Sequence, residues 1–202
     1  MNLKIVSYVI IRLIVLVVAG VTIHLFQDRD FVMMLILLFF TIIQFYRRRK
    51  SPSLKLYYIG FFMTAIGGIL AENWGIYNGL WEYHDLPDGR TFPYWLPFAW
   101  GLAFTFIYKF EAFFIEQLNI KKFQSKILLT TLCAMFLPLI GEIVTVQLGV
   151  WTYYGPLQFF GVPLYAVILL VLFHTTTYLL MIKINQKLNL PDPVFSVDKN
   201  TF

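Results

Sequence analysis

Charged residues, cysteine and histidine are all scarce in this sequence of 202 residues. Only 13% of the residues are charged and 59% are hydrophobic, whereas about a quarter of an ordinary soluble domain is charged. The single cysteine, Cys133, excludes a disulfide framework. His24, His84 and His174 lie far apart and form no H-x-x-x-H or H-x-x-H-H pattern. This spacing argues against the metal sites of membrane desaturases and metalloproteases.

Several common enzyme motifs are also missing. The sequence contains no G-x-S-x-G elbow, no phosphate-binding P-loop and no glycine-rich dinucleotide fingerprint. Glu82, Asp85 and Asp88 have the spacing of an acidic magnesium-diphosphate motif, but they lie in a loop rich in proline and glycine, where helical spacing has little meaning. We therefore expect no cofactor and no metal. The net charge of +5 is explained first by membrane topology, because no nucleic-acid motif is present.

Long apolar runs separated by short polar or basic segments are what the sequence has instead. A helix needs about 20 apolar residues to cross a bilayer. Six runs approach this length, at residues 5–26, 31–46, 56–77, 96–114, 127–146 and 162–184. The first is long for a signal peptide and no A-x-A site follows it, so we expect it to be retained. The sequence thus predicts an all-α membrane helix bundle with about six transmembrane helices.

Lysine and arginine are distributed unequally between the two sides of this layout. Only Arg29 and Arg90 fall on one side. The other side carries Lys4, Arg47, Arg48, Arg49, Lys50, Lys55, Lys121, Lys122, Lys126, Lys183 and Lys187. The positive-inside rule then places both termini in the cytoplasm, and we expect a bacterial inner membrane. Residues 1–190 are predicted to form one transmembrane domain, followed by a flexible cytoplasmic tail at 191–202.

Two segments of the sequence share one pattern. Residues 72–83 are ENWGIYNGLWEY and residues 142–153 are EIVTVQLGVWTY. In each, a glutamate is followed seven positions later by glycine and then by an aliphatic residue, tryptophan, any residue and tyrosine. We interpret the match as an internal repeat with units at about 56–114 and 127–184. Both units would run in the same direction, related by an axis along the membrane normal.

The repeated glutamates, Glu72 and Glu142, fall inside predicted membrane helices. A carboxylate there costs about 3 kcal/mol even on insertion scales, so such residues usually face an interior or a cavity. Two carboxyl groups related by symmetry should face a shared interior. Low dielectric and mutual repulsion would then keep one acid protonated while the other ionises, as general acid-base chemistry requires. Alternatively, each glutamate accepts hydrogen bonds from tryptophan or tyrosine and fastens the outer loops.

Aromatic residues gather around the repeated segments. Five of them are candidate substrate-binding residues: Trp74, Trp81, Tyr83, Trp151 and Tyr153. They are consistent with an ordinary aromatic belt at the membrane interface. The alternative is a cage whose π faces stabilise a carbocation.

Other polar residues also fall inside the predicted spans. His174 aligns with Tyr108 when the two units are matched on their prolines, and it is a further substrate-binding candidate. A lone histidine is more often a hydrogen-bonded core residue than a catalyst. Arg12, Lys109 and Glu111 lie nearer the inner side, where snorkelling or mutual pairing explains them.

Small residues recur at helical steps along the span that carries Glu72. Such a stripe lets a neighbouring helix approach closely. Its members are Gly60, Thr64, Gly67, Gly68, Ala71 and Gly75.

The segment 72–83, followed by a proline at the start of a new span, resembles a motif of integral-membrane carotenoid biosynthesis proteins. That motif is E-x-x-G-x-x-x-G-L with trailing tyrosines, and the family includes carotenoid 1,2-hydratases. More distantly, the duplicated spans resemble small membrane lycopene cyclases. The similarity covers about residues 68–170, but Thr145 replaces the Gly75 of the first copy. The Phe-Gly insert of the hydratases and the acidic-aromatic motif of the cyclases are missing.

This resemblance implies acid-initiated chemistry on an isoprenoid C=C bond. A carboxylic acid would protonate the alkene, aromatics would hold the carbocation, and water or an internal alkene would capture it. We therefore expect a membrane enzyme acting on a lipid-soluble carotenoid or terpenoid by hydration or cyclisation, with Glu72 and Glu142 as acid and base. The expected partners are the bilayer and this substrate, without nucleic acid, and the oligomeric state stays open.

Two other functions also fit the sequence. One is a small transporter that couples proton or cation movement to the paired glutamates. The parallel repeat and the scarcity of polar residues along a crossing path argue against it. The other is a lipid-binding membrane protein without catalytic activity.

Overall fold

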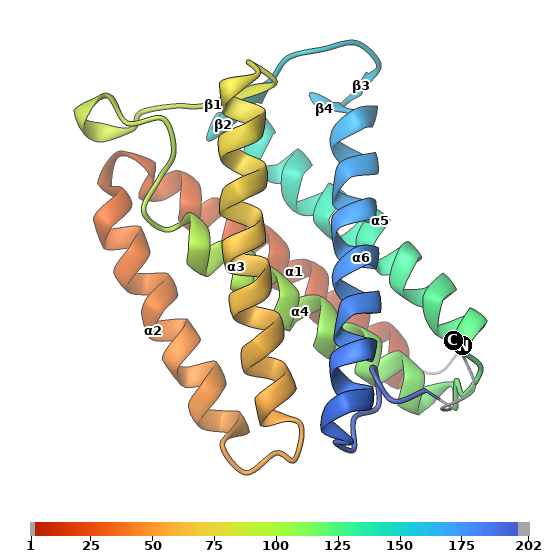
Figure 1. The fold of residues 1–202 in the computed structure, drawn as a ribbon. Coiled ribbons are helices and arrows are strands. Elements are labelled where there is room, and N and C mark those ends of the chain that lie inside the picture. The colour runs from red at the N-terminus through yellow and green to blue at the C-terminus, as the bar shows by residue number, and fades with distance from the viewer. Residues whose placement is uncertain (1–2, 198–202) are drawn as a thin grey trace.

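Residues 3–197, the part of the chain described by the computed structural model, form six long helices joined by short turns and loops (Figure 1). The helices are α1 (Leu3–Leu25), α2 (Asp30–Arg48), α3 (Leu54–Tyr77), α4 (Leu96–Gln117), α5 (Phe123–Gln147) and α6 (Leu164–Leu188). All six are long and apolar enough to cross a membrane. The predicted all-α bundle of six membrane helices is confirmed, and the chain is an integral membrane protein.

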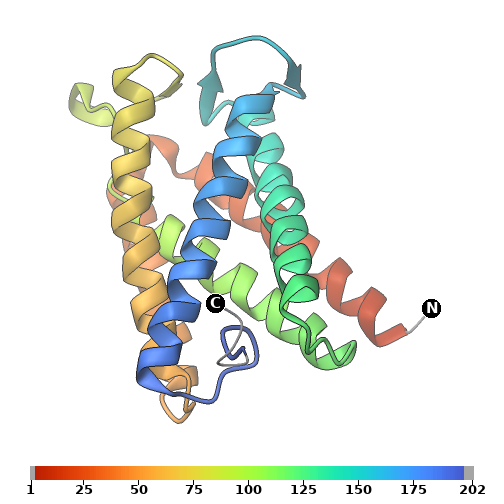
Figure 2. The same ribbon diagram turned by 45° about the vertical axis from the view of Figure 1, so that its right-hand side comes forward.

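Consecutive helices run in opposite directions, which gives the bundle two chemically different ends. The basic end holds the α2–α3 and α4–α5 turns, and both ends of the described chain lie on this side (Figure 2). The opposite end, here called the glutamate end, holds the loops at 78–95 and 148–163 and a short 3-10 helix, Gln27–Arg29. The run of basic residues at 47–50, three arginines and a lysine, belongs to this basic end, as the sequence predicts.

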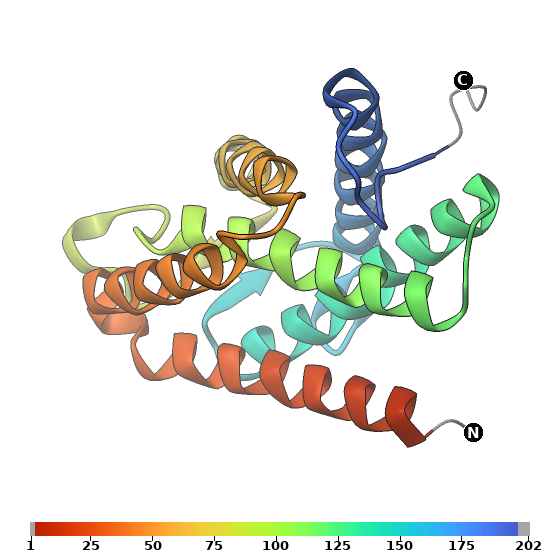
Figure 3. The same ribbon diagram turned by 90° about the horizontal axis from the view of Figure 1, so that it is seen from below.

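The helices pack in neighbouring pairs. α3 lies along α4, α5 lies along α6, and α1 and α2 pack against α5 and α4 respectively (Figure 3). The close approach of α3 and α4 depends on small residues. A Cβ atom added at Gly68 would lie 2.2 Å from Cγ of Trp100, and one at Gly60 would lie 1.9 Å from Cζ of Phe104. The predicted stripe of small residues therefore admits the aromatic side chains of α4.

α3 and α5 end in the same way, at the glycines of the repeated pattern. Gly79 and Gly149 have positive φ angles of 64° and 74°. The next backbone N–H, of Leu80 or Val150, donates to the carbonyl five residues back, at Gly75 or Thr145. This is the Schellman arrangement, in which an aliphatic residue follows the glycine. The glycine-aliphatic pair in the sequence pattern is therefore a helix stop.

Two short strands follow these helix ends and pair with each other. β1 (Trp81–Tyr83) and β2 (Trp151–Tyr153) are antiparallel. Trp81 lies opposite Tyr153, Tyr83 lies opposite Trp151, and Glu82 lies opposite Thr152. The first residue of each strand thus lies opposite the last residue of the other, and the two middle residues lie opposite each other. This register is that of a local two-fold axis through the middle pair. A second hairpin, β3 (Gln158–Phe159) with β4 (Val162–Pro163), leads into α6. These strands are not predicted from the sequence.

The loop between β1 and α4 is fastened to the start of α2 by an ion pair. Arg90 donates through both terminal nitrogens to Asp30, with 2.9 Å from Nη2 to Oδ1. The backbone N–H of Tyr94 donates to the same carboxylate over 3.0 Å. Asp30 is buried, so this bidentate contact holds the loop in place.

Residues 191–197, which the sequence assigns to a flexible tail, pack against the bundle in the structure. Val194 is fully buried and Phe195 is only 2% exposed. The Phe195 ring packs against Phe104, Tyr108 and Tyr178, with centroids 5.5–6.4 Å apart. These apolar side chains complete the core at the basic end of the bundle. Residues 198–202 of the predicted tail lie outside the described part.

Polar contacts also hold this segment. Tyr108 Oη donates to Asp192 Oδ2 over 2.7 Å, and Lys126 Nζ donates to the carbonyls of Pro193 and Ser196. Asp192 in turn accepts backbone N–H groups of the same turn, which satisfies its buried carboxylate.

We expect Phe195→Ala to destabilise the bundle by about 3 kcal/mol, because it removes a buried ring and leaves a cavity. Phe160→Ala is the matched control, since Phe160 is 61% exposed in a loop. Thermal unfolding in mild detergent should show a lower midpoint for the first variant alone. Equal midpoints for the two variants would contradict the packing of residues 191–197.

Candidate functional site

Glu72 lies near the end of α3, where two indole N–H groups reach its side chain. Trp81 Nε1 donates to Oε2 over 2.8 Å and Trp100 Nε1 donates to Oε1 over 3.1 Å. Trp81 reaches back because the Gly79 turn reverses the chain just beyond the helix. Glu72 is only 8% exposed, so both carboxyl oxygens are supplied with donors inside an apolar environment.

Glu142 occupies the matching place near the end of α5. Trp151 Nε1 donates to its Oε2 over 3.2 Å, which repeats the Trp81 contact of the first segment. Tyr153 Oη donates to the same oxygen over 2.7 Å. Within residues 3–197 the other oxygen, Oε1, accepts no hydrogen bond. Glu142 therefore differs from Glu72 in keeping one carboxyl oxygen open.

The β1–β2 ladder joins the two glutamate sites. Trp81 packs edge-on against Tyr153 with ring centroids 5.6 Å apart, and Tyr83 packs in the same way against Trp151 at 5.4 Å. Each tryptophan thus contacts the tyrosine of the other segment. The ladder fixes the distance between the two glutamate-bearing helix ends and turns both carboxyl groups toward one space.

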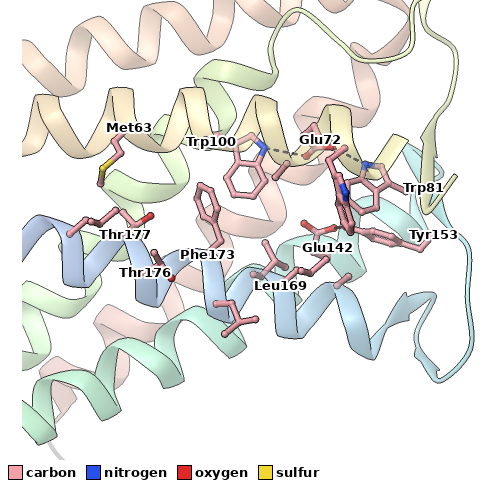
Figure 4. A pocket seen from close by; sticks show the side chains of 17 residues that line it. Met63, Glu72, Trp81, Trp100, Glu142, Tyr153, Leu169, Phe173, Thr176 and Thr177 are labelled. Atoms are coloured by element: carbon pink, nitrogen blue, oxygen red, sulfur yellow. Dashed lines mark hydrogen bonds between the residues drawn. The ribbon is translucent and has the colours of Figure 1, made fainter. Parts of the chain in front are cut away.

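That space is a pocket of about 480 Å³ between α3 and α6, within the usual size range of small-molecule sites (Figure 4). Glu72 and Glu142 lie at one end of it, beside Trp81 and Tyr153. The remainder is largely apolar. Its other lining residues are Met63, Gly67, Ala71, Trp74, Trp100, Ala166, Leu169, Leu170, Leu172, Phe173, Thr176, Thr177 and Leu180.

The pocket is elongated and open to the apolar exterior of the bundle. Along α6 its lining extends from Ala166 to Leu180, or about 20 Å at the rise of an α-helix. Leu172 and Leu180 also belong to the exposed apolar surface. A lipid-soluble molecule could therefore enter sideways from the bilayer.

The two tyrosines of the strands stay neutral near the carboxyl groups. Burial raises the pKa of Tyr83 and Tyr153 well above the usual value, and the charges of both glutamates raise it further. Their hydroxyls are therefore hydrogen-bond donors at ordinary pH, as the contact from Tyr153 to Glu142 requires. Both carboxyl groups raise the pKa of each tyrosine, because the two glutamate sites lie close together.

Five of the predicted site residues line this pocket: Glu72, Trp74, Trp81, Glu142 and Tyr153. Tyr83 and Trp151 are not in its lining. Tyr83 packs between Trp95 and Trp151 instead. The hydrogen bonds from the repeated tryptophans also match the alternative in which the glutamates fasten the loops.

His174 lies on α6 but does not line the pocket. Its Nε2 is 3.2 Å from Oε1 of Glu111, and both side chains are buried. Glu111 therefore pairs with His174 rather than with Arg12 or Lys109, so the suggested mutual pairing of those three residues is not seen.

Trp100 and Phe173 are pocket residues that sequence reasoning did not select. Trp100 contacts Glu72 from α4, and its ring packs against Phe173 at 4.9 Å. When the two units are aligned on Pro97 and Pro163, Trp100 matches Ala166. The small side chain of Ala166 leaves that side of the pocket open, whereas the indole closes the other. Only this alignment could have pointed to the difference.

Comparison with protein-family models, curated proteins and solved structures finds no match to this chain.

We expect Gly75→Ala to displace Trp81 from Glu72, because a Cβ at Gly75 would lie 1.9 Å from the Trp81 ring. Overpacking of this kind typically costs about 1–3 kcal/mol. Gly141→Ala is the control, since nothing lies within 4 Å of a Cβ there. Near-ultraviolet circular dichroism and thermal unfolding should change for Gly75→Ala only. Unaltered tryptophan signals in both variants would argue against the Trp81 contact.

Proposed function

We propose that this protein is a membrane enzyme that performs acid-base chemistry on the C=C bonds of a lipid-soluble isoprenoid. The observation that carries the proposal is the placement of Glu72 and Glu142 at one end of a single apolar pocket. Carboxyl groups inside a membrane are functional candidates by default, and here two of them face the same ligand-sized space.

The pocket favours a long apolar ligand without charge. Its length of about 20 Å along α6 suits an extended hydrocarbon chain, and its side opening suits delivery from the bilayer. Aromatic rings of Trp81, Trp100, Phe173 and Tyr153 lie in its lining. Their π faces would stabilise a carbocation formed beside the carboxyl groups.

The hydrogen bonds suggest different roles for the two acids. Indole N–H groups only donate, and both oxygens of Glu72 accept one, which favours its charged form. Glu142 has an oxygen that takes no hydrogen bond from residues 3–197, and this oxygen can carry a proton. We therefore assign Glu142 as the acid and Glu72 as the base.

The chemistry follows from these roles. Glu142 transfers its proton to one alkene carbon, and positive charge develops on the other. In a hydration, water forms the new C–O bond and releases a proton. In a cyclisation, an internal alkene forms a C–C bond and a neighbouring C–H releases the proton. Glu72 accepts that proton in either case, and exchange returns it to Glu142, so the enzyme is unchanged after a turnover.

The orientation and the duplication are part of the same proposal. The excess of lysine and arginine at the basic end favours a cytoplasmic position for both termini, in a bacterial inner membrane. The pocket end with the glutamates would then lie toward the outer leaflet. The matching helix stops and matching tryptophan-glutamate contacts support a parallel duplication of the α3–α4 and α5–α6 hairpins.

A purely structural role for the glutamates is the second candidate. It is favoured by the two hydrogen bonds that each side chain accepts from loop or helix donors. In that case the pocket would hold a lipid without changing it.

Substitution of the acids separates the candidates. We expect Glu142→Gln and Glu72→Gln each to lower turnover of linear carotenoids or polyprenyl compounds about 100-fold or more, the usual contribution of general acid-base catalysis. Glu82→Gln is the matched control, because Glu82 is an exposed acid on β1. Liquid chromatography with mass spectrometry would detect a gain of water, or a cyclised product of unchanged mass at a different retention time. Unchanged turnover in both pocket variants would exclude the acid-base assignment.

A further inference from the structure

Basic side chains from three helices gather toward the basic end of the bundle. Arg12 comes from α1, Arg47 and Arg48 come from the last turn of α2, and Lys109 comes from α4. The charges of Arg48, Arg12 and Arg47 all act on the Lys109 ammonium group. The four residues thus form one cluster of positive charge, here called the basic cluster.

Arg12 is held in place by aromatic rings rather than by an acid. Its guanidinium carbon lies 4.7 Å from the centre of the Tyr8 ring and 5.7 Å from that of Phe106. The Tyr8 ring stacks on Phe113 at 3.7 Å, and its hydroxyl donates to the Lys109 carbonyl, which fixes α1 against α4. Nε of Arg12 is buried and has no hydrogen-bond partner in the described chain.

Lys109 and Arg48 are also without an acidic partner. Lys109 Nζ donates to the neutral amide of Gln44 on α2. Arg48 lies over the rings of Tyr57 and Tyr108, at 4.5 and 4.8 Å from their centres. Within residues 3–197 no carboxylate forms an ion pair with Arg12, Arg48 or Lys109, and the ion pairs there involve other residues.

The nearby acids are committed elsewhere. Glu111 is hydrogen-bonded to His174, on the α6 side of α4. Asp192 accepts the Tyr108 hydroxyl and two backbone N–H groups of its own turn. Several cations close together in a membrane bundle repel one another and are costly unless an anion is present. The basic cluster therefore needs a counter-ion, and residues 3–197 do not supply one.

We propose that the basic cluster binds the phosphate group of an anionic membrane lipid. Arg12 is nine residues from the start of α1, and Lys109 is eight residues from the end of α4. These distances correspond to about 12–14 Å along the helix axes, and long basic side chains extend toward the interface from such depths. Basic sites between transmembrane helices are where anionic headgroups bind.

The chemistry of the cluster matches an oxyanion such as phosphate better than a simple halide. The planar guanidinium of Arg12 offers parallel N–H donors that suit two phosphate oxygens, and its orphaned Nε is one of these donors. Lys109 adds a point charge from the facing helix. A lipid has the advantage over free phosphate that its acyl chains lie along the exposed apolar faces of α1 and α2, which include Ile11, Ile14 and Phe39.

The proposal depends on the membrane position of the bundle and not on the isoprenoid chemistry, so each can fail without the other. Its test is the double variant Arg12→Gln/Lys109→Gln. The matched control is Lys183→Gln/Lys187→Gln, which removes the same charge from exposed positions of α6. Each purified protein is unfolded thermally in neutral detergent with added phosphatidylglycerol, phosphatidylcholine of the same chains, or inorganic phosphate.

We expect phosphatidylglycerol to raise the unfolding midpoint of wild type and control by about 5 °C or more at saturating concentration, and to leave the cluster variant unchanged. Phosphatidylcholine and inorganic phosphate should have little effect on any of them. An equal response of the cluster variant, or an equal effect of inorganic phosphate on wild type, would overturn the lipid site. If the cluster variant does not fold, native mass spectrometry of wild type decides: preferential retention of phosphatidylglycerol supports the site, and equal retention of both lipids excludes it.

Discussion

A carboxyl group buried in an apolar bundle must be given hydrogen-bond donors, and the structure meets this requirement with indole N–H groups. Trp81 and Trp151 each lie nine residues beyond the glutamate that they contact. A glycine with positive φ makes this return possible, because it ends the helix and reverses the chain within a few residues. The repeated pattern is thus one structural unit: acid, helix stop and donor.

Pairing of the two units produces the site. Because β1 and β2 pair around their central residues, the donor of one unit packs against the tyrosine of the other. The two carboxyl groups consequently border a common space, and the differences between the units decide its shape. Trp100 fills one side and contacts Glu72, while the corresponding Ala166 leaves the other side open. Under the proposed function, these differences would give the two acids unequal roles.

The sequence predicts the helices well, because apolar runs of membrane length are local information. It singles out the two glutamates by their matching places in the repeated pattern. Pairing of β1 with β2 was missed because three-residue strands have no clear pattern of their own. The packed segment 191–197 was missed because its few apolar side chains, Val194, Phe195 and Val197, lie among proline and polar residues. The Trp100 contact depends on the crossing of α3 and α4, which Gly68 permits but does not specify.

The proposed function requires Glu72 and Glu142 to contact one ligand in a pocket open to the bilayer. The most direct test is a structure of the protein in a lipid nanodisc with a linear polyprenyl compound. We expect an extended ligand along α6, from Leu180 to the carboxyl groups, with one end in contact with both glutamates. Glutamates that face separate spaces, or a ligand bound away from them, would contradict it.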